Sequence, residues 1–280
     1  RGGNCISASN EPLYVIDGFI GAGDLNLIDP NDIESIEILK DAAATSIYGS
    51  RGANGVIIVT TKRGSEGRND VAVNAYVGVQ QIAKRLEMLN AREYAVMLNQ
   101  QDVLSNQEPC IENPSVYGKG TDWQDEILRL AFMQNYQVAA SGGNKDGRYY
   151  LSLSMFDQDG VIKNSGIRRY QTRLNLDRKM RHNINIGANF QFSYTQREPN
   201  LVSLGGFDYQ SSALATPPTM NIYNEDGSYA SDSPSRVVSN DIDNVVAQLN
   251  ERKKQEKAAS IYAGIFAEWE AIKDLNKIII

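Results

Sequence analysis

The sequence is poor in the residues that build disulfides, metal sites and many catalytic centres. Its 280 residues include two cysteines and one histidine. Cys5 and Cys110 lie far apart in no metal-like spacing, and His182 stands beside Arg181, where we interpret it as a solvated turn residue. The sequence shows no Ser/His/Asp set, no carboxylate pair with a supporting base and no metal cluster. We therefore expect no catalysis, no metal and no other cofactor.

Long apolar runs and an excess of positive charge are also missing. No stretch approaches the roughly 18 apolar residues that a membrane-spanning helix needs, so a helical membrane protein is excluded. A membrane β-barrel stays possible, because only every second residue of its strands must be apolar. The net charge of −6 argues against a large basic surface for nucleic acid. With 41% hydrophobic and 22% charged residues, the composition is that of an ordinary folded chain with a sizeable core.

The two ends also lack familiar features. The sequence opens with Arg1-Gly2-Gly3 instead of a methionine or a signal peptide, and it stops inside the apolar run 278–280. We expect the chain to be a piece of a longer protein.

Residues 12–64 predict a small α+β unit with tight turns. Three extended runs rich in aliphatic and β-branched residues are expected to be strands, namely residues 12–16, 33–40 and 56–61. Asp41 can cap a helix over residues 42–48, and Gly49 suits the left-handed position after that helix. Asp17-Gly18 and Asn54-Gly55 are typical of tight turns.

The glycines of this unit superficially suggest a phosphate-binding loop. Gly49, Gly52 and Gly55 are closely spaced, but no GK[ST] follows them. Their spacing also does not place a cradle between a strand and a helix. A nucleotide site is therefore disfavoured.

The same residues resemble the end of the plug domain of TonB-dependent receptors. The string LYVIDG is followed by DPNDIESIEILKDAAATSIYGSRGANGVIIVTTKRG, and the match covers almost every residue from 12 to 64. The KDA and SRGANG variants are similar to the SusC/RagA branch of Bacteroidetes. Later segments such as GTDWQDEI, RYYLSLS and RYQTRLNLD look like early barrel segments of the same branch.

Beyond residue 64 the pattern changes to long alternation of period two. In residues 183–194 the even positions are apolar, apart from the final tyrosine, and the odd positions are polar or glycine. A strand with one apolar and one polar face produces this pattern, whereas a helix does not. Similar runs occur at residues 71–80, 136–141, 149–156, 170–177 and 261–270.

Two architectures fit such strands. A soluble sandwich buries the apolar face, whereas a membrane barrel turns it toward lipid. Short and long connections alternate along the chain, as periplasmic turns and extracellular loops do. Aromatic residues near the strand ends suit the girdles of a barrel, and they are Tyr136, Tyr149, Tyr150, Tyr170, Tyr194 and Trp269. After a plug-like segment, these signals favour the barrel.

We therefore expect a membrane β-barrel with an α+β plug. Residues 1–66 are expected to form the C-terminal part of the plug, and residues 67–280 about six antiparallel strands of an open partial barrel with long extracellular loops. In residues 183–194 the apolar side chains should face lipid and the polar ones the plug, so an arginine should be tolerated better at Gln191 than at Phe190. Asn90 with Glu93 has the capping-box pattern of a helix in the first long loop.

The resemblance implies import of a nutrient, a glycan or a peptide, across the cell outer membrane. The implied partners are the TonB-ExbB-ExbD energy-transducing complex, a SusD-like surface lipoprotein, the oligosaccharide or peptide substrate and outer-membrane lipid, with no nucleic acid. Two alternatives stay open. One is a TonB-dependent siderophore or cobalamin receptor, and the other is a soluble β-rich surface-binding protein.

Candidate site residues follow from the resemblance and from the charges. The plug-motif positions are Asp17, Gly18, Asp41, Gly49, Arg51, Gly52, Asn54, Gly55 and Arg63. Among these, Arg51 and Arg63 are candidates for plug-to-barrel contacts, with Glu268 and Glu270 as possible barrel partners; solvated basic residues are the alternative. Ring faces pack on sugar C–H faces. Aromatic residues of the long loop are therefore possible ligand contacts or simply order the loop, and they are Phe207, Tyr209, Tyr223 and Tyr229.

Overall fold

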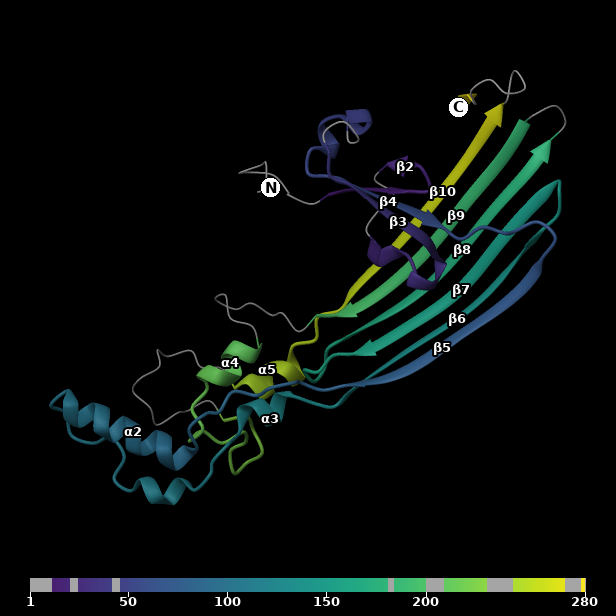
Figure 1. Cartoon of the computed structure of the whole chain (residues 1–280). Coiled ribbons are helices and arrows are strands. Elements are labelled where there is room, and N and C mark those ends of the chain that lie inside the picture. The colour runs from purple at the N-terminus through teal and green to yellow at the C-terminus, as the bar shows by residue number, and fades with distance from the viewer. Residues whose placement is uncertain are drawn as a thin grey trace.

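The computed structural model describes residues 12–20, 25–41, 46–180, 184–199, 209–230, 244–269 and 278–279. These residues form a small sheet, a long curved sheet and a cluster of short helices at one end of the long sheet (Figure 1). In the described residues, no helix is long and apolar enough to cross a membrane.

The small sheet has four strands in the order β2-β1-β4-β3. Their bounds are β1 Leu13–Ile16, β2 Phe19–Ile20, β3 Ile33–Leu39 and β4 Val56–Thr61. β1 runs parallel to β4, and the turn between β1 and β2 has Asp17 at φ 49° and Gly18 at φ 87°. Two successive positive φ values are the geometry of a tight hairpin turn. The three strands and the turn predicted from the sequence are confirmed.

The predicted helix over residues 42–48 is only partly covered, because residues 42–45 lie outside the described part. The chain from Ser46 to Gly52 forms a 3₁₀ element, η3, rather than the end of an α-helix. Gly49 has a positive φ of 61°, as expected, but its ψ of −151° produces a kink between two turns instead of a stop. Two further 3₁₀ turns precede β3, η1 at Leu25–Leu27 and η2 at Pro30–Asp32.

The long sheet has seven antiparallel strands that follow chain order, from β5 to β11. Their bounds are β5 Asn69–Gln80, β6 Ala131–Gly143, β7 Gly147–Asp159, β8 Gly166–Met180, β9 Ile184–Glu198, β10 Glu256–Trp269 and β11 Ile278–Ile279. All six alternating runs are strands, and most extend well beyond the predicted bounds. Residues 181–183, with His182, lie outside the described part.

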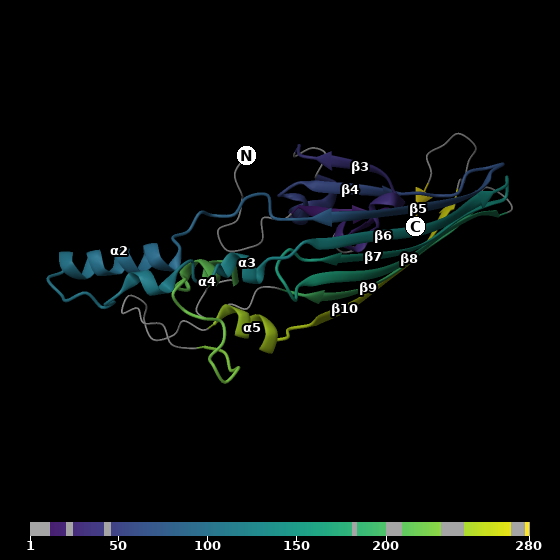
Figure 2. The same ribbon diagram turned by 90° about the horizontal axis from the view of Figure 1, so that it is seen from below.

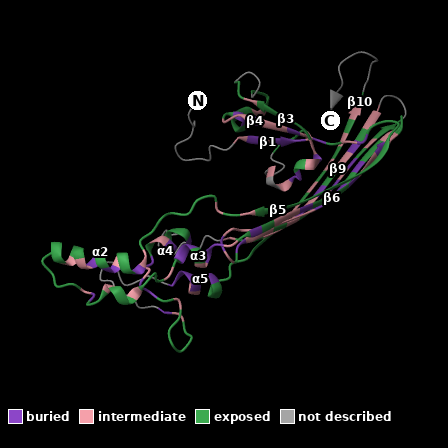
Figure 3. Ribbon diagram, turned by 60° about the horizontal axis from the view of Figure 1, so that its bottom comes forward, coloured by how far each residue is buried: buried purple, intermediate pink, exposed green. Residues whose placement is uncertain are grey.

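Residues of opposite parity occupy opposite faces of the long sheet. Polar side chains are buried on the face toward the small sheet, for example Gln137, Ser152, Asn175, Gln191 and Ser193. Large apolar side chains are exposed on the other face, for example Val73, Phe132, Leu153, Phe190 and Ile265. Figure 3 shows this mixture of buried and exposed residues along the strands, in contrast to the buried interior of the helical cluster.

The exposed face has the height and the border of a lipid-facing band. At ~3.3 Å per residue and a tilt of ~40°, β9 from Ile184 to Tyr194 rises about 25 Å, the height of an outer-membrane apolar belt. Strand pairing brings Tyr136, Met155, Tyr170 and Tyr194 into one row across β6 to β9. This row is an aromatic border at the end of the sheet that faces the helices.

The helical cluster gathers the two long connections at one end of the sheet, as Figures 1 and 2 show. Its elements are α2 Ala91–Leu104, η4 Pro114–Tyr117, α3 Trp123–Ile127, α4 Tyr209–Ala215 and α5 Val245–Glu251. Trp123 and Val245 lie in a shared core, and the Trp123 indole N–H donates to the Pro217 carbonyl at 2.9 Å. The predicted capping box of Asn90 and Glu93 is confirmed at the start of α2.

The long sheet is open in the part of the chain that the structure describes, since β5 and β11 lie at its two ends. The smallest closed barrels need about 8 strands. We therefore expect the 280-residue chain, expressed alone in detergent, to migrate identically on gels before and after heating. A heat-modifiable band, the behaviour of a closed barrel, would contradict this open arrangement.

Candidate functional site at the contact between the two sheets

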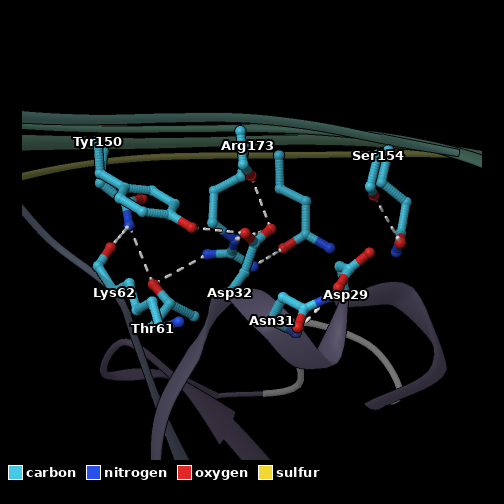
Figure 4. Close-up of polar contacts among 12 residues, drawn as sticks. Asp29, Asn31, Asp32, Thr61, Lys62, Tyr150, Ser154 and Arg173 are labelled. Carbon is cyan, nitrogen blue, oxygen red and sulfur yellow. Dashed lines mark hydrogen bonds and ion pairs between the residues drawn. The ribbon is translucent and has the colours of Figure 1, made fainter. Parts of the chain in front are cut away.

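The carboxylate of Asp32 is the centre of the contact between the small and the long sheet. Asp29 caps η2 by accepting from the Asn31 N–H at 2.8 Å, which presents Asp32 toward the long sheet. The Asp32 carboxylate accepts three hydrogen bonds of 2.7 Å, from Gln137 Nε2, the Tyr150 hydroxyl and Ser152 Oγ. Figure 4 shows Tyr150 and Arg173 reaching from the long sheet to Asp32. Neutral donors of β6 and β7 thus surround a buried charge.

Arg173 of β8 is the buried cation of this contact. Its guanidinium lies 3.2 Å from Asp17 Oδ2 and 3.9 Å from Asp32 Oδ2, and these side chains are only 3–4% exposed. It also donates to Thr61 Oγ1 at 3.2 Å and to Gln191 Oε1. Arg173 of β8 therefore bridges two carboxylates, Asp17 in the β1–β2 turn and Asp32 in η2.

Thr61 joins the same network from the end of β4. Its N–H and hydroxyl donate to the Asp17 carboxylate at 2.9 and 2.7 Å. Asn175 Nδ2 lies 3.0 Å from Thr61 Oγ1 and donates to the Lys62 carbonyl at 2.9 Å. Asp17 therefore ties the β1–β2 turn to β4 and to the long sheet at once.

Backbone groups next to the small sheet also contact the long sheet directly. The Leu27 carbonyl accepts from the amide groups of Gln171 at 2.5 Å and of Gln191. Gly64 approaches β6 and β7 so closely that a Cβ atom there would lie 2.3 Å from the Gly142 carbonyl oxygen. A side chain at position 64 would therefore push the two sheets apart.

Comparison with known proteins shows which family the chain resembles. Residues 1–56 match the family model described as TonB-dependent Receptor Plug Domain. TonB-dependent receptor P26 of Formosa agariphila is 40% identical over 94% of this chain, which spans 27% of that relative. TonB-dependent receptor SusC of Bacteroides thetaiotaomicron is 36% identical over 82% of this chain, with 23% of its own length covered. The structure of the RagAB peptide transporter superposes with a TM-score of 0.77 at 25% identity, over 97% of this chain and 34% of that chain.

The chain is of the SusC/RagA type of TonB-dependent receptor. The small sheet is accordingly plug structure, and the long sheet is part of the β-barrel wall. Members of this family are outer-membrane proteins. The chain spans about a quarter of the relatives that it matches, at 27% and 26% of the length of two Formosa agariphila receptors.

The structure shows where the charged residues named as candidates for contacts between plug and wall lie. Arg63 reaches the wall, with its guanidinium 2.6 Å from Asp177 and 5.4 Å from the Phe266 ring centroid. Its ion-pair partner is Asp177, whereas Glu268 was named from the sequence as a possible partner. Glu268 lies on the plug-facing side of β10 and lines a cavity together with Arg63. Glu270 lies outside the described residues.

The other plug-motif positions shape turns. Arg51 is exposed in η3, and no ion pair or hydrogen bond of the described residues joins its side chain to the wall. Gly52 is buried at the end of η3, Asn54 lies in the following turn, and Asp41 is exposed. Gly55 has a φ of 99°, and a Cβ atom there would meet the Leu39 carbonyl oxygen at 3.3 Å.

The loop aromatics separate into two groups. Tyr209 is only 3% exposed in the helical core, which fits the alternative that its ring orders the loop. Tyr223 and Tyr229 stack with their ring centroids 5.1 Å apart, and Tyr223 is 51% exposed. Phe207 lies outside the described residues. The Tyr223–Tyr229 pair stays the candidate ligand surface of this loop.

Most residues of the plug–wall contact were not singled out from the sequence. Asp32 belongs to the DPND string, which indicates only a turn before a strand. Arg173 was one of several polar residues in an alternating run. The usable signal was parity, because polar residues at every second position of β6 to β9 form the plug-facing surface. In the described residues, no group of three metal-ligating side chains is present.

Burial makes the contribution of Asp32 to the free energy of unfolding depend on pH. Desolvation raises the pKa of this carboxyl above its ordinary 3.8, although the hydrogen bonds from Ser152 and Tyr150 and the charge of Arg173 each lower it. The folded protein thus binds the proton more tightly than the unfolded chain, so this residue's contribution to the free energy of unfolding falls as the pH rises above about 4. We expect full-length Asp32→Asn receptor to lose less thermal stability than wild type between pH 4 and 6. Parallel melting curves against pH would contradict this assignment.

Proposed function

We propose that the complete protein imports a nutrient across the outer membrane by a TonB-dependent mechanism. Residues 1–66 act in it as plug and residues 67–280 as the first part of the barrel wall. The observation that carries this proposal is the polar contact in which the plug carboxylates Asp17 and Asp32 are bound by Arg173 and by neutral donors of the wall. A barrel of about 22 strands encloses a lumen wide enough to leak, so a plug is required to close it.

The plug contact has the chemistry of a closure that can be released. It is made of hydrogen bonds and ion pairs rather than a large apolar interface, and water can replace such bonds when the plug moves. We propose that the TonB-ExbB-ExbD complex supplies the force for this movement. In this proposal the protein catalyses no reaction, and its function is transport.

The substrate class that we favour is an oligosaccharide or a peptide, captured together with a SusD-like lipoprotein. Its support is the similarity to SusC and to the RagAB peptide transporter. The exposed Tyr223–Tyr229 pair offers an aromatic surface in the loop region for such a ligand. The exposed apolar face of the wall disfavours a soluble surface-binding protein, since large apolar patches are rare on soluble monomers.

The test is uptake by cells that carry the full-length receptor. Labelled glycan and peptide mixtures, ferric siderophores and cobalamin are offered to cells with and without TonB, and with and without the SusD-like lipoprotein. We expect uptake of a glycan or peptide fraction that requires both. Uptake of iron or cobalamin alone would favour the other receptor class, and TonB-independent uptake or hydrolysis by purified protein would contradict the mechanism.

A further inference from the structure

Two cavities lie side by side along the plug-facing surface of the wall, next to the β1–β2 turn. The cavity nearer the helical loops has a volume of about 220 Å³, with Arg173, Asn189 and Tyr262 in its lining. The cavity nearer the short turns has a volume of about 710 Å³, with Arg63 and Glu268 in its lining. We call them the loop-side and the turn-side cavity.

Phe19 of β2 lies where the two cavities meet, because it lines both of them, as does the neighbouring Asp17. Its ring packs against Gly264 of β10, where an added Cβ atom would lie 2.2 Å from the ring carbon Cζ. Only glycine leaves room for this close approach. One plug side chain therefore packs on β10 at the border between the two cavities.

Polar and charged side chains line part of the loop-side cavity and much of the turn-side cavity. The Asn189 side chain, which lines the loop-side cavity, has its amide nitrogen and oxygen buried without a hydrogen-bond partner in the described residues. Buried polar atoms of this kind are normally satisfied by water or by a polar ligand. The turn-side cavity is lined by charges of both signs, among them Arg63, Arg148, Glu66, Asp177 and Glu268.

The plug contacts the two sides of the described wall in different ways. Its direct hydrogen bonds reach β6, β7, β8 and β9, through residues such as Gln137, Tyr150, Asn175 and Gln191. Among the described residues, no hydrogen bond joins the plug to β10. There, Phe19 packs against Gly264, and the Arg63 guanidinium lies over the Phe266 ring.

We propose that the imported solute passes between the β1–β2 turn and strands β9 and β10, and that Phe19 packed on Gly264 closes this route at rest. The inference rests on the proposed import function and adds to it the position of the route and its closing residue. Lining charges of both signs suit a polar solute, charged or zwitterionic, rather than an apolar one.

The first experiment measures leakage. Full-length Phe19→Ala receptor is expressed in cells without TonB, and entry of the hydrophilic antibiotic vancomycin is compared with that in wild type. The matched control is Ile38→Ala, which truncates a plug side chain that is 58% exposed and does not line either cavity. We expect several-fold greater entry for Phe19→Ala alone, at equal receptor levels in the outer membrane. Equal entry for the two variants would overturn the closing role of Phe19.

The second experiment locks the route reversibly. Phe19→Cys and Gly264→Cys are combined in a cysteine-free receptor and joined by a short thiol reagent with a cleavable spacer. The control pair is Gly78→Cys with Met133→Cys, which lie opposite each other on β5 and β6 within the wall. We expect TonB-dependent uptake to stop when residues 19 and 264 are joined, to return after cleavage, and to continue with the control pair joined.

The outcomes separate this route from import itself. Uptake that continues with residues 19 and 264 joined overturns the route and leaves TonB-dependent import standing. Absence of TonB-dependent uptake in the untreated receptor overturns import, and the route with it.

Discussion

Replacing Arg173 with methionine is expected to destabilise the plug–wall contact by about 3–5 kcal/mol, the range for a buried ion pair that loses one partner. The change leaves the carboxylates of Asp17 and Asp32 buried without their shared cation. The methionine side chain keeps much of the volume, so the loss is chiefly one of charge. Thermal unfolding of the full-length receptor and its amount in the outer membrane measure the effect.

Arg168 on the same strand is the matched control. It points to the opposite face, and its side chain is 48% exposed in an ion pair with Asp157 at 2.9 Å. Exposed ion pairs contribute about 0–1 kcal/mol, so Arg168→Met should change stability little. Similar losses for both variants would contradict the central role assigned to Arg173.

Phe190→Arg is expected to reduce outer-membrane assembly strongly, because an arginine on the lipid face near mid-membrane costs about 2–4 kcal/mol. Phe190 lies on the exposed apolar face of β9. On the plug-facing side of the same strand, Asn185 lines the charged turn-side cavity and lies directly opposite Glu268 of β10. Asn185→Arg should therefore assemble almost as wild type. Assembly of Phe190→Arg with failure of Asn185→Arg would show that the two faces are reversed.

The structure corrects the sequence-based choice of Gln191 as the tolerant position. Gln191 does face the plug, but it is only 7% exposed. It donates to the Leu27 carbonyl and accepts from Arg173. An arginine there would place a second cation beside Arg173 and remove both hydrogen bonds. Parity predicted the face correctly, but it carried no information about how crowded that face is.

The strands were predictable because their signal is local. Alternation at every second residue marks β9 in the sequence itself, and the capping box before α2 needs only Asn90 and Glu93. The contact between plug and wall depends instead on register. Arg63 binds Asp177 of β8 rather than Glu268 of β10, although both carboxylates lie on the plug-facing side of their strands. The place of the plug along the strands decides between them, and the sequence pattern does not encode that place.

The Asp32 network was beyond sequence reasoning for a related reason. Asp32 is separated from its donors Gln137, Tyr150 and Ser152 by more than a hundred residues. Serine, glutamine and tyrosine on an alternating strand equally suit a water-filled lumen. Only the bound plug turns these ordinary polar residues into specific partners of a buried carboxylate.

Single-channel conductance tests the central claim most directly, because it asks whether this plug closes a membrane barrel. Purified full-length receptor and a variant without the plug strands are reconstituted in planar lipid bilayers at equal amounts. The plug–wall contact predicts almost no conductance for the intact receptor and large, steady conductance for the variant. Equal conductance of the two proteins, or none in the plug-free barrel despite its insertion, would contradict the account.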